Sequence, residues 1–181
     1  TGACAALTTR STGAFGVMVN KRIAAGNLFL GTFDLQQALT NTLHATRFGV
    51  PFSMKPVSFK GWYNYQPGET YQDAFGKTLE GKSDHGAIYA VLYRNHDDAG
   101  NEVVLFGDNV KTSQQVVAIA DLGDIGQTNG WQPFEAQFLY RQNIDEETLR
   151  NMGYSLAIVF SSSNEGDKFE GAVGSTLLID D

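Results

Sequence analysis

The sequence predicts an all-β protein, a jelly-roll β-sandwich of two antiparallel sheets with one or two short helices. Short apolar runs separated by Gly, Asn, Asp and Pro recur along the 181 residues, which is typical of strands joined by turns. The chain also contains 20 glycines, 12 phenylalanines and 7 tyrosines, and glycine suits turns whereas aromatic residues suit strands. Many short strands with few helices fit a sandwich or a barrel, and a sandwich is the simpler of the two.

Several of the expected strands alternate apolar and polar residues with a period of two. In the strand SFKGWYNYQ, Phe59 and Tyr63 share one face, while Trp62 and Asn64 share the other. The first face therefore belongs to the core and the second to solvent. We expect strands at 3–9, 27–33, 57–66, 87–95, 103–107, 115–121, 133–141, 155–162 and 175–180.

Two segments carry a helical signal. The segment DLQQALTNTLH at 34–44 has leucines at every fourth position, so it predicts one short helix. The segment DEETLRNMG at 145–153 predicts a further turn or two, because Asp145 can cap its start and Gly153 can end it.

Composition and charge indicate one globular domain over residues 1–181. Hydrophobic residues make up 42% and charged residues 18%, and a chain of this length can bury a substantial core. The net charge of −7 argues against a nucleic-acid binder, which carries a basic face, and against binding to an anionic membrane surface. There is no apolar run of about 20 residues that would span a membrane. The chain starts at TGACAALTT without an initiator methionine, so we expect it to be excised from a longer protein.

Four segments together resemble the bacterial putative carbohydrate metabolism domain family. They occur in the same order as in that family and cover nearly the whole chain: GNLFLGTF (26–33), RFGVPFSMKPVSFKGWYNYQPGETY (47–71), SDHGAIYAVLYRN (83–95) and SSSNEGDKFEGAVGSTLLIDD (161–181). The resemblance implies a jelly roll similar to carbohydrate-binding modules. It also implies an extracytoplasmic bacterial protein, at the cell surface or anchored to the outer membrane, with a preceding immunoglobulin-like domain. Other domains of the same chain are then its expected partners.

Carbohydrate sites place aromatic rings next to planar polar groups, because sugar C–H faces pack on rings and hydroxyls need hydrogen-bond partners. The strand at 57–66 offers Trp62 and Asn64 on its solvent side. The alternative is that Trp62 packs beneath a loop or helix that covers this sheet.

A second mixture of this kind lies in IYAVLYRN. If Ile88 and Leu92 point inward, Tyr89 and Tyr93 point to the other face, and Arg94 lies at the strand end. The opposite register would put the tyrosines in the core. Trp131, at a loop–strand junction, is a further candidate at the rim of a site, or a plug at the end of the core.

No pattern of acids or histidines indicates catalysis or a transition-metal site. Acids such as Glu69, Asp84 and Glu135 have no spacing that singles out a glycosidase pair, and the three histidines lack metal-binding spacing. Carbohydrate modules of the jelly-roll type often hold a structural Ca²⁺ through loop carbonyls and an acid near the last strand. The resemblance therefore makes Asp180, or else Asp181, a candidate calcium ligand, and no cofactor is required.

The predicted function is a non-catalytic carbohydrate-binding module of an extracytoplasmic glycan-capture or glycan-utilisation system. Its expected contacts with the glycan are Trp62, Asn64, Tyr89, Tyr93, Arg94 and Trp131. Two other classes stay open: a structural or adhesion module that binds proteins, and a glycoside-active enzyme.

Overall fold

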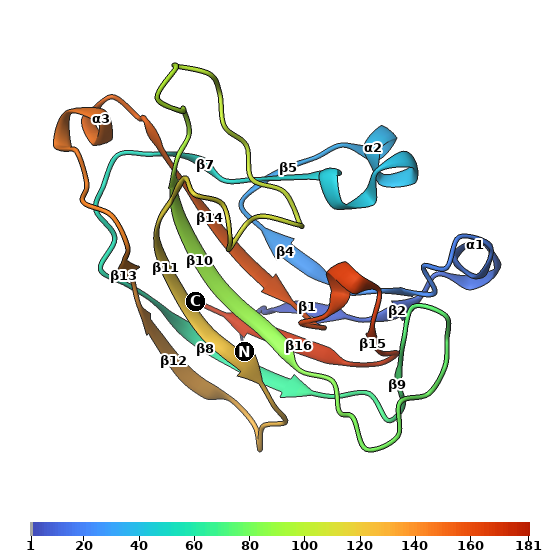
Figure 1. Cartoon of the computed structure of the whole chain (residues 1–181). Helices are drawn as coiled ribbons and strands as arrows, with labels where there is room; N and C mark the ends of the chain where they lie inside the picture. The colour runs from blue at the N-terminus through green and yellow to red at the C-terminus, as the bar shows by residue number, and fades with distance from the viewer. Residues whose placement is uncertain (1) are drawn as a thin grey trace.

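Two antiparallel sheets face each other in the computed structural model, which describes residues 2–181 (Figure 1). The smaller sheet has four strands in the order β1 (Ala5–Thr8), β16 (Thr176–Asp180), β8 (Ser58–Gln66) and β12 (Gln132–Gln137). The larger has six, in the order β13 (Leu139–Tyr140), β11 (Val116–Ile125), β10 (Gly86–Arg94), β14 (Tyr154–Ser161) and β4 (Asn27–Phe29), with β7 (Val50–Phe52) also paired to β14. The all-β jelly-roll prediction is confirmed.

The main core lies between these two sheets, as the alternating strand patterns predict. Tyr65 and Leu177 of the small sheet pack with Ile88 and Phe160 of the large one. On β12, Phe134 also points into this core, while Glu135 is exposed. The period of two therefore assigned the inner faces of β8 and β12 correctly.

A second apolar layer covers the outer face of the six-stranded sheet. Phe48, Leu105 and Val110 pack on that face against Tyr89 and Tyr93 of β10. All residues of β10 from Gly86 to Tyr93 are consequently buried. A strand that is covered on both faces reads as a continuous apolar run, and this is the pattern of GAIYAVLY.

Three short two-stranded ladders flank the sandwich and were not expected from the sequence. They pair β2 (Arg10–Ser11) with β3 (Ile23–Ala24), β5 (Gly31–Phe33) with β6 (Thr46–Phe48), and β9 (Tyr71–Gln72) with β15 (Gly171–Ala172). The expected strand at 27–33 is divided into β4 and β5, because Gly31 has φ of 149° and a Cβ there would lie 2.1 Å from the Arg47 carbonyl oxygen. Only glycine allows such an approach.

Two other expected strands differ from the structure. The segment 103–107 is a loop that carries the buried Leu105, whose contact with Phe48 is an isolated bridge. The segment 133–141 divides at Phe138 into β12 and β13, which belong to different sheets. Here the chain crosses from one sheet to the other, a step that alternation alone does not reveal.

The helices are short: α1 (Gly13–Met18), α2 (Leu35–Thr40) and α3 (Glu146–Arg150), with 3₁₀ turns at Thr42–His44 (η1) and Gly166–Lys168 (η2). The predicted α2 and α3 are present, and Asp34 and Asp145 cap them by accepting backbone N–H groups. The third helix, α1, was not predicted. In Figure 1, α1 and α2 lie on one side of the sheets and α3 on the other. None of the helices in residues 2–181 is long and apolar enough to cross a membrane.

Candidate functional site

A pocket of about 520 Å³ opens on the outer face of the six-stranded sheet, and we call it the sheet pocket. Its floor consists of Ala87 and Tyr89 from β10, Val159 and Ser161 from β14, and Phe29 from β4. This floor is open because the second apolar layer covers only part of the outer face. Phe48 and Val110 belong to that layer and also line the pocket, so they lie at the edge of the layer.

Four chain segments that are distant in sequence form the walls. They are 23–25 with β3, Phe33 with the η1 region, the loop at 107–112, and the loop at 163–169 with η2. Lys21, just before the 23–25 segment, links it to two of the other walls. Its Nζ donates a hydrogen bond to Thr42 Oγ1 in η1 and lies 5.3 Å from the centre of the Phe169 ring. The walls thus support one another across the rim.

Aromatic side chains supply most of the apolar surface. Phe33 lines the pocket with 53% of its surface exposed, so its ring is free to stack on a ligand. Phe29 and Phe48 also line the pocket and form an edge-to-face pair with their ring centres 5.6 Å apart. Lys111 Nζ lies 4.2 Å from the centre of the Tyr89 ring and partly covers it.

Phe169 has an unusual backbone conformation at the pocket wall. It follows η2 in the left-handed region, with φ of 59° and ψ of 30°, which is strained for a bulky residue. Its N–H donates to the Gly166 carbonyl at 3.1 Å. Strain of this kind is found preferentially at functional sites, and here it places a ring in the wall of the sheet pocket.

Both lysines that line the pocket form close ion pairs. Lys111 contacts Asp121 at 2.8 Å, and Lys168 forms an ion pair with Glu165. Burial raises the pKa of the Tyr89 hydroxyl, and the nearby carboxylates of Asp121 and then Asp167 raise it further. Tyr89 is therefore a neutral hydrogen-bonding group at physiological pH, not a nucleophile.

The buried Asp84 holds the loop that forms one wall. Its Oδ2 accepts hydrogen bonds from Ser163 Oγ (2.6 Å), Ala172 N–H (2.7 Å) and Ser175 Oγ (2.7 Å). The chain enters the wall at Ser163 and leaves it at Ala172, so one carboxylate fixes both ends. Thr9 Oγ1 adds a further contact to Ser163 Oγ at 2.6 Å.

Three of the sequence-predicted residues lie together on the outer face of the four-stranded sheet, which we call the tryptophan face. Trp62 is 44% exposed and pairs with Asp180 on one side and Pro133 on the other. Trp131 is 41% exposed and shares this face by alternation with Pro133. Asn64 is partly buried, and its Oδ1 accepts a hydrogen bond from Thr128 Oγ1 at 2.8 Å. Trp62 is therefore not covered by a loop, and Trp131 is not a core plug.

The expectation that Tyr89 and Tyr93 offer their rings as a sugar platform needs correction. They do lie on the face opposite to Ile88 and Leu92, as predicted, but the second apolar layer covers this face. Tyr93 is 3% exposed, and its hydroxyl donates to the Phe48 carbonyl at 2.7 Å. Tyr93 is thus a core residue, whereas Tyr89 is mostly buried but reaches the sheet pocket.

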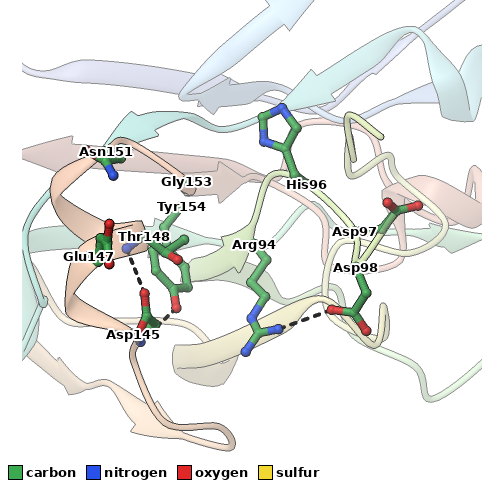
Figure 2. Close-up of a pocket in the computed structure, with 10 residues that line it drawn as sticks. All are labelled: Arg94, His96, Asp97, Asp98, Asp145, Glu147, Thr148, Asn151, Gly153 and Tyr154. Atoms are coloured by element: carbon green, nitrogen blue, oxygen red, sulfur yellow. Dashed lines mark hydrogen bonds and ion pairs between the residues drawn. The ribbon is translucent and has the colours of Figure 1, made fainter. Parts of the chain in front are cut away.

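Arg94 lies at the other end of β10, in a separate polar pocket of about 480 Å³ (Figure 2). Its Nη1 is 3.7 Å from Asp98 Oδ1. Across the pocket, Asp145 accepts the Thr148 N–H, and the Tyr154 hydroxyl accepts the Asp145 N–H at 3.0 Å. The six predicted contact residues therefore occupy four different places and do not form one site.

The candidate metal ligand Asp180 lies beside Trp62 at the end of β16. Within residues 2–181, no three or more His, Cys, Asp or Glu side chains are grouped so that they could hold a metal ion. A calcium site built mainly from backbone carbonyls stays a prediction.

Sequence reasoning did not identify Phe33, Phe169 or Asp167 as site residues. Phe33 ends the short strand β5, whereas Asp167 and Phe169 lie in and after η2, and only the packing of four short segments brings them together. The one available signal was FEG at 169–171, where a phenylalanine stands in a glycine-rich loop.

Two solved structures are similar to this chain. A solved structure from Bacteroides thetaiotaomicron, described as a putative glycoside hydrolase, is similar over 100% of this chain with 45% identity and a TM-score of 0.93. Another from Bacteroides vulgatus, described in the same way, is similar over 98% with 40% identity and a TM-score of 0.89. This chain spans 52% of the first and 70% of the second, and no curated protein matches it.

The family model described as the putative carbohydrate metabolism domain matches residues 1–181, the whole chain. The segments that carry the sequence resemblance include β4 and β5, β8, β10, and the loop from Ser161 to β16. These are the elements that build the sandwich and one wall of the sheet pocket. The chain belongs to the putative carbohydrate metabolism domain family.

Proposed function

We propose that this domain binds a carbohydrate in the sheet pocket without cleaving it. The observation that carries the proposal is the combination, in one concave site, of an exposed aromatic ring with amide, carboxylate and ammonium groups. Phe33 provides the ring, and Asn164, Asp167 and Lys168 are among the polar groups beside it. Sugars need both kinds of partner, and small-ligand sites are usually concave pockets of this size.

The sheet pocket suits a sugar better than the tryptophan face does. A ligand on an open sheet face stays largely hydrated, whereas a pocket removes more of its surface from water. We therefore place the primary contact at Phe33 and Tyr89, with Trp62 and Trp131 as a secondary surface at most.

The carbohydrate-related family also supports a proposal about the cellular setting. We propose an extracytoplasmic system for glycan capture or utilisation, at the cell surface or outer membrane, in which this domain acts with other domains of its chain. The first solved relative supports this, because it is about twice as long as the matched segment. A structural calcium ion, with Asp180 as a ligand, is part of the same proposal.

A second candidate function is glycoside cleavage. Three carboxylates, Asp108, Glu165 and Asp167, line the same pocket, and a glycosidase needs two that flank the scissile bond. The two solved relatives are described as putative glycoside hydrolases. Two of these carboxylates are already engaged, because Asp108 contacts His44 and Glu165 pairs with Lys168, so binding remains our first proposal.

The test is a glycan-array screen of the purified domain with calcium, repeated with EDTA. Phe33→Ala should abolish or strongly weaken binding, because it removes an exposed ring that the fold does not need. Trp62→Ala is the matched control: it also removes an exposed ring, but from the other sheet. Loss in the Trp62 variant with retention in the Phe33 variant would move the site to the tryptophan face.

Any glycan that binds should then be incubated with the protein and analysed for shorter products. Intact glycan supports the binding function. Cleavage that is lost in Asp167→Asn, with binding retained, would establish the second candidate instead. A change of binding in EDTA would support the calcium site.

A further inference from the structure

We propose that the sheet pocket selects glycans that carry no carboxylate, sulfate or phosphate groups. The inference rests on the proposed function and specifies its ligand class. It depends on the way in which the charged groups around the pocket are already paired.

Both ammonium groups that line the pocket are neutralised by the protein itself. Lys111 Nζ lies 2.8 Å from Asp121 Oδ2 and also sits over the Tyr89 ring. Lys168 forms its ion pair with Glu165 three residues earlier. An anionic sugar would have to displace one of these carboxylates to pair with a lysine of the lining, and it would leave that carboxylate unpaired. The ammonium of Lys21 at the rim is engaged by Thr42 Oγ1 and the Phe169 ring.

The carboxylates around the pocket outnumber these ammonium groups. Asp108, Glu165 and Asp167 line the pocket against Lys111 and Lys168, which leaves one net negative charge in the lining. Asp167 makes no ion pair with any residue in 2–181 at the distances that define the other pairs.

Further carboxylates stand just behind this lining. Asp121 lies behind Lys111, and Asp124 accepts a hydrogen bond from Asn164 Nδ2 at 2.6 Å. The protein as a whole carries −7. The field inside the pocket therefore repels an anion both at short range and on approach.

The same groups favour neutral sugar hydroxyls. A carboxylate accepts hydrogen bonds from hydroxyl donors, and such bonds are stronger than those between neutral groups. Asp167 and Asp108 can accept from the polar edge of a sugar whose C–H face lies on Phe33. Hydroxylated or N-acetylated sugars fit this arrangement, whereas uronic acids and sulfated sugars do not.

The experiment compares neutral glycans (xylan, galactan, β-glucan, N-acetylchitooligosaccharides) with anionic ones (polygalacturonate, alginate, chondroitin sulfate, heparin) at low ionic strength. We expect wild-type protein to bind only neutral members. An anionic glycan should bind at least about tenfold more weakly than the neutral glycan with the same sugar backbone, as ~1.4 kcal/mol of repulsion would produce.

Asp121→Asn provides a gain-of-function test, because it frees Lys111 from its carboxylate. This variant should bind anionic glycans measurably better than wild type, and high salt should remove the gain. Asp98→Asn is the matched control: it makes the same change in net charge, but in the Arg94 pocket at the opposite end of β10. It should leave anionic binding unchanged.

Two results would overturn the inference in distinguishable ways. If wild type binds an anionic glycan and Phe33→Ala abolishes that binding, the pocket is the site but the selectivity is wrong. If no glycan of either class binds, the proposed carbohydrate function fails, and the selectivity fails with it.

Discussion

The Asp84 carboxylate accepts a hydrogen bond from Ser163 Oγ at 2.6 Å, although the two residues are 79 positions apart and both are buried. This contact joins the start of β10 to the loop that forms a wall of the sheet pocket. It also explains the buried serines of this region. Ser163, just after β14, and Ser175, just before β16, both donate to Asp84. Ser162 Oγ accepts the Gly26 N–H at 2.8 Å. A site wall without regular secondary structure thus depends on side-chain hydrogen bonds.

Replacement of Asp84 by Ala should destabilise the fold strongly. The substitution leaves the Ser163, Ala172 and Ser175 donors without an acceptor, and a buried unsatisfied group costs about 1–3 kcal/mol. We expect the free energy of unfolding in urea to fall by ~3 kcal/mol or more. Ser113→Ala, which removes a partly exposed hydroxyl that accepts a single hydrogen bond from the Gln115 N–H, should have a much smaller effect. A change below about 1 kcal/mol in the Asp84 variant would show that the network does not hold the wall.

Phe169→Gly and Phe169→Ala separate backbone strain from the contribution of the ring. Both variants remove the ring from the sheet pocket and should weaken glycan binding. Only glycine adopts φ of 59° without strain, so the glycine variant should be more stable than the alanine variant by about 1 kcal/mol. Thermal or urea unfolding of the pair measures this difference. Equal stabilities would mean that residue 169 leaves the left-handed region in solution.

Tyr93→Phe should affect stability but not glycan binding. The hydroxyl lost is the one that donates to the Phe48 carbonyl, and loss of a buried hydrogen bond costs roughly 1–2 kcal/mol. Binding titration with the glycan identified on the array should give an unchanged dissociation constant. A marked loss of affinity at unchanged stability would restore Tyr93 as a ligand contact.

The cap of α3 should make stability depend on acid pH. Asp145 accepts the Thr148 N–H, and this hydrogen bonding lowers the pKa of its carboxyl below the usual 3.8. A lowered folded-state pKa contributes stability that is present above the unfolded pKa and is lost as the pH falls through the folded value. Wild type should therefore lose more stability than Asp145→Ala when the pH falls from neutral to about 3.

Urea unfolding at the two pH values measures this effect. The control is Asp98→Ala, which removes a fully exposed acid that contacts only Arg94 among the described residues. It should keep the acid dependence of wild type. Identical acid dependence in wild type and Asp145→Ala would show that the cap contributes nothing.

The sequence alone determined the sandwich and its inner faces. The alternation around Trp62 placed Tyr63 and Tyr65 on the face opposite to Trp62, and the structure has both tyrosines in the core cluster. Whether a loop covers Trp62 was open in the sequence, and the structure shows Trp62 exposed. Local chemistry also predicted the cap at Asp145. These features depend on neighbours within a few residues of the chain, and for that reason the sequence pattern contains them.

Only the tertiary structure decided which outer face is covered and where a pocket remains. The alternation of β10 placed Tyr89 and Tyr93 on the same face, but segments far away in sequence cover Tyr93 and leave Tyr89 at the edge of a cavity. Phe33 and Asp167 lie 134 positions apart and line the same pocket. Long-range packing of short segments, the strand β5 and the turn η2, brings them together, and no local periodicity encodes that packing.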